Sequence, residues 1–106
     1  MRVYAIMYIQ PMRIYEWDEH KNKINQAAHG IDFRTGAEVF DDPCFVAFVE
    51  SIKDGEERWH AIGMVRAVTV VAVVHTYSEK GSDEVIRIIS CRRASSHERK
   101  IYEEAR

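Results

Sequence analysis

The fold is decided by one stretch of the chain, Val68–Tyr77, which reads VTVVAVVHTY. Its residues are β-branched almost throughout, a composition that favours strands over helices. Because polar residues do not alternate with apolar ones, the stretch predicts a central strand that is buried on both faces. We therefore expect neighbouring segments to supply strands on either side of it.

Three further strands are expected around this one. Apolar and aromatic residues predict a strand over Cys44–Glu50. The turn Asp54-Gly55, which tolerates positive φ, joins it as a hairpin to a strand over Glu57–Met64. The last strand is expected over Val85–Arg92. Four strands that follow one another through short turns predict a mainly antiparallel sheet.

Helices are expected before and after the strands. Asp18 is a natural N-cap for a helix that ends at Gly30, and Asp32 caps a second, shorter helix. Near the C-terminus, Ser95 and Glu98 form a capping box for a helix over Ser96–Arg106. The fold class is therefore α+β, with two N-terminal helices, a four-stranded sheet and a C-terminal helix.

The 106 residues are enough for one domain, and an apolar content of 46% excludes a disordered chain. We expect a single domain over residues 12–106. Residues 1–11 are expected to be an N-terminal extension, either an edge strand or a flexible leader produced by an early start codon. The longest apolar runs are too short to span a membrane, so no membrane partner is expected. Two cysteines and no secretory signal indicate reduced core thiols in a cytoplasmic protein.

The formal net charge of −2 hides a strong asymmetry along the chain. Residues 1–57 carry six basic and eleven acidic side chains, whereas residues 58–106 carry nine basic and six acidic ones. Average charge argues against nucleic-acid binding, but a binding protein needs only one positive face. The C-terminal half is therefore where such a face is expected.

Arginines on the expected strands are the strongest candidates for such a face. Arg58, Arg87, Arg92 and Arg93 lie on or beside strands, where arginine is poor core material. Strict alternation places Arg87 and Arg93 on one face of the last strand and Arg92 on the other. Guanidinium groups bind phosphate oxygens through two parallel hydrogen bonds. These arginines therefore predict a phosphodiester site, unless they are simply solvated.

Candidates for proton transfer are fewer. His60 shares a predicted face with Arg58, whereas His75 at the end of the central strand is expected to be a satisfied core histidine. His29 precedes the helix-capping Gly30 and has the alternative role of contacting the last helical carbonyls. No spacing predicts a metal site or a cofactor, and no glycine-rich phosphate loop or nucleophilic serine motif is present.

Several motifs spread over about residues 14–104 keep a common order and spacing. They are Glu16-Trp17-Asp18, Lys21, Asn25, His29-Gly30-Ile31, Phe33, Ala37, Val39-Phe40-Asp41-Asp42-Pro43, Gly55-Glu56-Glu57-Arg58, Ile62-Gly63, Ile86-Arg87-Ile88-Ile89-Ser90, Arg92, Ala94, Glu98 and Tyr102-Glu103. Together they are similar to the signature of the BrnT family. The resemblance implies a RelE/ParE-like fold and a ribonuclease toxin of a type II toxin–antitoxin pair that inhibits translation.

The resemblance also implies partners and site residues. The partner would be a BrnA-like antitoxin with a ribbon-helix-helix module, through which alone the complex would contact operator DNA. The polar positions that match the family pattern are Lys21, His29, Glu57, Arg58, Arg87, Arg92 and Arg93.

A metal-independent endoribonuclease is the expected activity. Arg58 and Arg87 would clamp the phosphate, Arg92 or Arg93 would neutralise the backbone nearby, and His60, Glu57 or His29 would move protons. Arg93, Lys21 and His29 are assigned to RNA binding, and His29 is in addition one of the three alternative proton carriers.

Two alternatives remain open from the sequence. In the first, the chain is a weak or inactive toxin homologue that acts mainly as an antitoxin-binding operon co-repressor. In the second, it is a small-molecule enzyme that uses the same histidines and arginines.

Overall fold

In the computed structural model, which describes residues 12–106, two helices precede most of the strands and a third helix follows them. The expectation for residues 1–11 lies outside the described residues. The elements are, in chain order, β1 (Arg13–Glu16), α1 (Glu19–His29), α2 (Phe33–Ala37), the 3-10 helix η1 (Glu38–Asp41), β2 (Val46–Lys53), β3 (Glu56–Val65), β4 (Thr69–Lys80), β5 (Asp83–Arg93) and α3 (Ser96–Glu104). The predicted α+β class is confirmed.

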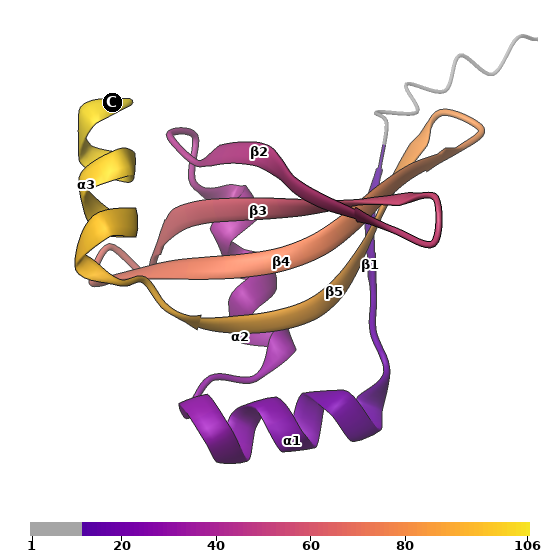
Figure 1. Cartoon of the computed structure of the whole chain (residues 1–106), viewed down its shortest axis with the longest axis horizontal. Coiled ribbons are helices and arrows are strands. Elements are labelled where there is room, and N and C mark those ends of the chain that lie inside the picture. The colour runs from indigo at the N-terminus through magenta and orange to yellow at the C-terminus, as the bar shows by residue number, and fades with distance from the viewer. Residues whose placement is uncertain (1–11) are drawn as a thin grey trace, which may run out of the picture.

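The sheet formed by the described residues has five strands in the order β1-β5-β4-β3-β2. The prediction of four antiparallel strands is wrong at one edge, where β1 pairs in parallel with Glu84–Arg87 of β5. Figure 1 shows this short strand beside β5. The four residues of β1 are too few for a period of two to be recognised, and they lead almost directly into the helix N-cap.

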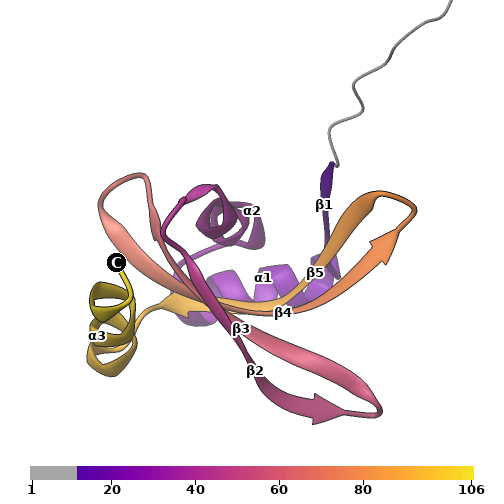
Figure 2. The same cartoon turned by 90° about the horizontal axis from the view of Figure 1, so that it is seen from above.

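Helices α2 and α3 lie on opposite faces of the sheet (Figure 2). On the α2 face, the larger core includes Phe33 and Val39, both fully buried, together with apolar side chains of β3, β4 and β5. On the α3 face, a smaller cluster joins Ile62 of β3 to Tyr102 of α3. The strands at the centre of the sheet are therefore covered on both sides, as the composition of Val68–Tyr77 predicts.

The two cysteines have different environments. Cys91 lies in the α2-face core, where burial raises the pKa of its thiol to about 11, whereas Cys44 is exposed. The prediction that both are core residues is therefore wrong for Cys44. Cys44 precedes β2 instead of lying within it, and its backbone N–H is bound by the Asp42 carboxylate. Within residues 12–106, no helix is both long and apolar enough to cross a membrane.

Helix α1 is attached to the edge of β5 through the side chain of Asn25. Its caps match the prediction: the Asp18 carboxylate accepts from the first-turn N–H groups, and Gly30 has φ of +74°. The Asn25 side chain donates to the Cys91 carbonyl at 2.8 Å and accepts from the Cys91 N–H at 3.1 Å. It thereby satisfies backbone groups of β5 that no strand pairs with on that side.

The two hairpins diverge at one end of the sheet (Figure 2). Pairing between β3 and β4 begins at Trp59 and His75, although β3 extends back to Glu56 and β4 extends on to Lys80. Beyond that pair, the β2–β3 and β4–β5 hairpins point away from each other. Trp59 and His75 therefore lie at the base of a fork between the hairpins.

We expect Asn25→Ala to destabilise the protein by about 2–4 kcal/mol, because it leaves the buried Cys91 and Ile31 backbone groups unpaired. Urea unfolding followed by circular dichroism measures the loss. Gln26→Ala, at an exposed position of the same helix, is the control. A loss below about 1 kcal/mol would show that the asparagine is not the anchor of α1.

Candidate active site

A bulge in β5 brings two of the predicted arginines to the same face. Ile89 has no partner on β4, so the side-chain alternation of β5 is reset at this position. Arg87 and Arg92 consequently share the α3 face, whereas Arg93 lies opposite Val71 on the α2 face. The prediction that Arg87 and Arg93 share a face is therefore wrong, because it assumed an uninterrupted strand.

Strand β3 contributes two more basic side chains to the α3 face. Its alternation matches the prediction, since Ala61 belongs to the α2-face core and Ile62 to the α3-face cluster. Arg58 and His60 are four and two residues before Ile62, so the alternation of side chains places both on the α3 face. We call the four side chains Arg58, His60, Arg87 and Arg92 the basic cluster.

His60 is the buried centre of this cluster. Only 6% of the residue is exposed, and the Phe48 ring stacks on the imidazole with 5.2 Å between centroids. Its Nδ1 lies 3.2 Å from Glu50 Oε1, and its Nε2 lies 2.6 Å from Glu98 Oε2. The second pair is poorly aligned for a hydrogen bond, so we treat it as a close electrostatic contact. Two carboxylates therefore fix the ring.

Glu98 connects α3 to the basic cluster. Its carboxylate accepts two hydrogen bonds from the Arg92 guanidinium, at 2.6 and 3.0 Å, and one from the Ser95 N–H at 2.8 Å. Burial alone would raise the pKa of this carboxyl group, but the bonds from Arg92 and Ser95 outweigh it and hold the pKa at about 2. Glu98 is therefore a fixed negative charge beside His60.

Arg58 and Arg87 are more available to a ligand. The Nε of Arg58 is buried without a hydrogen-bond partner, and no acidic side chain within residues 12–106 pairs with this arginine. Arg87 pairs with Glu56 at 2.7 Å, but both side chains are almost half exposed. Such a pair contributes little to stability and can exchange for a phosphate.

The remaining predicted residues lie outside the basic cluster. Glu57 is exposed and lies on the same face of β3 as Trp59, so it does not orient Arg58. The glutamate that pairs with an arginine is its neighbour Glu56, which contacts Arg87. Lys21 and His29 line a hollow of about 230 Å³ between α1 and β5, next to Ser90. Arg93 borders a separate hollow beside Thr35 on the α2 face.

Sequence reasoning missed the two carboxylates that hold His60. The capping box correctly placed Glu98 at the start of α3, but it gave no sign that the same carboxylate faces the sheet. Glu50 lies beside the register shift of β2, where alternation does not predict its direction. Among residues 12–106, no group of three histidine, cysteine, aspartate or glutamate side chains could hold a metal ion.

Comparison with known proteins identifies the family. The model of the ribonuclease toxin BrnT of type II toxin–antitoxin systems matches residues 17–98. The chain belongs to the BrnT family. It is also similar to the ribonuclease toxin BrnT of Brucella abortus, whose crystal structure was determined at 1.1 Å resolution. That match has 35% sequence identity and a TM-score of 0.56, and it covers 80% of this chain and 99% of the other. No curated protein sequence is significantly similar to the chain.

Membership of the BrnT family confirms the resemblance seen in the sequence, and with it the ribonuclease toxin function. Every residue of the basic cluster lies within the matched segment, as do Glu50 and Glu98. The arginine and histidine cluster is thus part of the BrnT domain and not of the segments that flank it.

The low pKa of Glu98 predicts an acid-sensitive fold. Because folding favours the ionised carboxylate, its contribution is complete above the ordinary pKa of 4.5 and is lost as the pH falls toward 2. The wild type should lose on the order of 3 kcal/mol over this interval through Glu98. Glu98→Gln keeps a capping side chain and should lose correspondingly less.

Urea unfolding at a series of pH values measures this difference. Glu103→Gln, an exposed position of the same helix, is the matched control and should follow the wild type. Parallel profiles for Glu98→Gln and the wild type would contradict the assignment of Glu98 as the acid-sensitive group.

Proposed function

We propose that the basic cluster is where this BrnT-family toxin cleaves RNA. The observation that carries the proposal is the convergence of Arg58, His60, Arg87 and Arg92 on one face of the sheet. Three guanidinium groups around a buried imidazole combine phosphate binding with proton transfer, the two things that RNA cleavage requires.

The proposed reaction uses the RNA 2′-hydroxyl as the nucleophile and needs no metal ion. The 2′-oxygen forms a bond to phosphorus, the bond from phosphorus to the 5′-oxygen breaks, and a cyclic phosphate remains. Arg58 has no carboxylate partner within residues 12–106, and Arg87 exchanges Glu56 for a phosphate oxygen. Their charges neutralise the oxygens of the phosphorane as it forms.

His60 is the proposed proton acceptor for the 2′-hydroxyl. The Glu50 side chain on its Nδ1 is 45% exposed, so substrate can displace it, whereas Glu98 beside Nε2 is only 9% exposed and is held by Arg92. Glu98 and Arg92 therefore position the ring, and the Nδ1 side receives the proton. The leaving 5′-oxygen takes a proton from solvent. Glu57 and His29 have no part in this scheme, because they lie outside the cluster.

The finer features implied by the BrnT resemblance are part of the proposal. We infer that a BrnA-like ribbon-helix-helix antitoxin neutralises the chain in the cytoplasm and carries it to operator DNA, and that the fold is RelE/ParE-like. Lys21 and His29 would bind the RNA backbone where it passes over the edge of β5. Arg93 lies on the far face, so it has no direct contact with the cleaved phosphate.

We expect Arg58→Ala and Arg87→Ala each to reduce RNA cleavage about a hundredfold or more, because each removes a donor to the developing charge. Cleavage of a labelled RNA by the purified protein measures the rate, and growth arrest on expression measures toxicity. Arg34→Ala, at an exposed position on α2, is the matched control. Undiminished toxicity of both strand variants would refute the proposed site.

The same experiment separates the enzyme from a co-repressor. A chain that only binds its antitoxin should leave growth unchanged when the wild type is expressed alone. Growth arrest by the wild type, lost in the arginine variants, favours the ribonuclease.

Removal of divalent metal tests the reaction type. Because the proposed nucleophile and proton acceptor are a 2′-hydroxyl and an imidazole, cleavage should continue at an undiminished rate in excess EDTA. An RNA whose 2′-hydroxyls are replaced by 2′-O-methyl groups should resist cleavage. Inhibition by EDTA that added Mg²⁺ reverses would overturn the metal-independent mechanism.

A further inference from the structure

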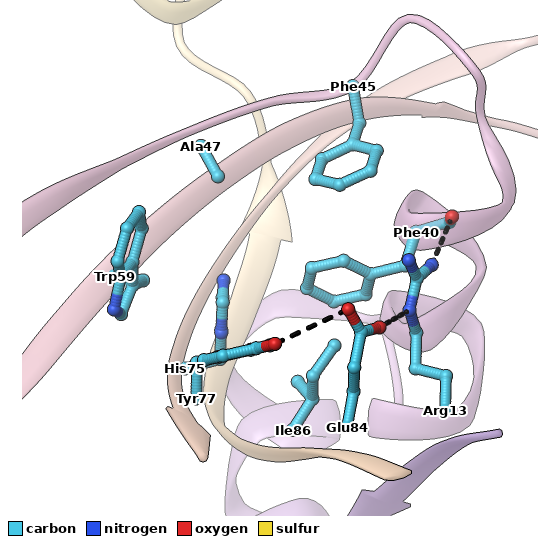
Figure 3. A pocket seen from close by; sticks show the side chains of 9 residues that line it. All are labelled: Arg13, Phe40, Phe45, Ala47, Trp59, His75, Tyr77, Glu84 and Ile86. Atoms are coloured by element: carbon cyan, nitrogen blue, oxygen red, sulfur yellow. Dashed lines mark hydrogen bonds and ion pairs between the residues drawn. The ribbon is translucent and has the colours of Figure 1, made fainter. Parts of the chain in front are cut away.

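A second site lies on the opposite face of the sheet, between the sheet and η1. It is a pocket of about 260 Å³ with aromatic walls. Figure 3 shows Trp59 across the opening from Phe40 and Phe45, with His75 and Tyr77 between them. The volume is below that of pockets for drug-sized ligands and suits one planar ring system. Nothing in the proposed cleavage reaction uses this pocket.

His75 gives the pocket a polar floor. Only 3% of the residue is exposed, and Nδ1 lies 3.1 Å from the Thr76 carbonyl, to which it donates. The other ring nitrogen, Nε2, is buried without a partner. Burial lowers the pKa of His75, which favours the neutral ring. In a neutral ring whose Nδ1 carries the proton, Nε2 is an unused hydrogen-bond acceptor.

The rim of the pocket carries polar groups as well. Arg13 donates to Glu84 at 2.9 Å and to the Phe40 carbonyl at 2.8 Å, and the Tyr77 hydroxyl lies 3.4 Å from the other Glu84 oxygen (Figure 3). A ligand in the pocket therefore meets aromatic rings on its faces and hydrogen-bonding groups at its edges. The expectation that His75 is a satisfied core histidine is wrong for one of its two nitrogens, because the ring borders a pocket instead of a closed core.

The pocket and the basic cluster lie on the two sides of the fork between the hairpins. Trp59 and His75 form the last pair of β3 with β4 before the hairpins diverge. Their chain neighbours Arg58 and Thr76 point to the other face of the sheet, where the basic cluster lies. Arg87 of β5 is the partner of Thr76. Trp59, a wall of the pocket, and Arg58, an arginine of the cluster, are therefore consecutive residues of β3.

We propose that the pocket binds one base of the RNA substrate, next to the phosphodiester that is cleaved. This inference rests on the proposed function, since it takes the basic cluster as the phosphate site. A base has flat faces that stack on aromatic rings, and its edge carries N–H groups for an acceptor. An aliphatic side chain of a protein partner would leave His75 Nε2 unpaired. The pocket therefore favours a base over an apolar peptide side chain.

The acceptor at the floor requires an N–H donor on the edge of the ligand. All four bases carry one, because adenine, cytosine and guanine have an exocyclic amino group and uracil has a ring N–H. We therefore expect N3-methyluridine, which lacks this ring N–H, to bind less tightly than uridine.

Trp59 fluorescence tests binding without any cleavage. Trp17 is the second tryptophan of the chain, so Trp17→Phe leaves Trp59 as the single reporter. Titration with adenosine, cytidine, guanosine or uridine should quench this emission, N3-methyluridine should quench it less than uridine, and ribose should not quench it. No quenching by any nucleoside at millimolar concentration would overturn the proposal, and equal quenching by uridine and N3-methyluridine would overturn the role of His75.

Cleavage of an abasic substrate tests the position of the base. Tyr77→Ala removes a wall residue that is 40% exposed, so the fold should tolerate it. It should lower cleavage of intact RNA about tenfold. An RNA that lacks the base next to the cleaved bond should be cleaved equally by the variant and the wild type. A tenfold difference that persists on abasic RNA would overturn the assignment.

These outcomes separate the two proposals. If the wild type cleaves RNA but neither test responds to the base, the pocket proposal fails and the ribonuclease site stands. If nucleosides quench Trp59 although Arg58→Ala and Arg87→Ala still cleave normally, the pocket stands and the site is wrong. If Tyr77→Ala cleaves RNA normally but no longer binds the antitoxin, the pocket is a peptide site instead.

Discussion

The extra residue in β5 is the constraint on which the arrangement of the site depends. Without the bulge at Ile89, a strand with Cys91 in the α2-face core would turn Arg87 into the same core and expose Ile88. Burying an unpaired guanidinium costs far more than interrupting one strand pair. The bulge lets Ile88 and Cys91 both face inward while Arg87 and Arg92 face outward together. A local irregularity of the sheet therefore assembles the cluster of charges.

The geometry at His60 depends in turn on how α3 is held. Few of its residues are buried, and its main anchor is Tyr102, which donates to the Asp42 carboxylate at 2.5 Å. Burial and the hydrogen bond to Asp42 raise the pKa of Tyr102 to about 12, so the hydroxyl keeps its proton. The same carboxylate accepts from the Met64 N–H at 2.7 Å. Asp42 thereby joins α3 to β3, the strand that carries His60, and keeps Glu98 beside the imidazole.

The sequence predicted the elements better than their contacts. Caps at Asp18, Gly30 and Ser95 are local signals, and each marks its helix boundary correctly. The bulge at Ile89 has no such signal, so the faces of β5 were assigned wrongly. The role of Asp42 between α3 and β3 has no sequence signal either, because its partners are 22 and 60 residues away. Contacts of that kind are fixed by packing and leave no period or motif in the chain.

The charges of the site explain how a mildly acidic protein can bind RNA. The four basic side chains of the cluster lie among three carboxylates, Glu50, Glu56 and Glu98, so the free face has little excess charge. Nonspecific attraction of RNA should therefore be weak and easily screened by salt. In the proposed site, phosphate would displace Glu50 and Glu56, which are exposed, but not Glu98, which is buried and held by Arg92. Positive charge would thus become free only where a phosphate competes for it, which favours a bound substrate over a polyanion that does not fit the site.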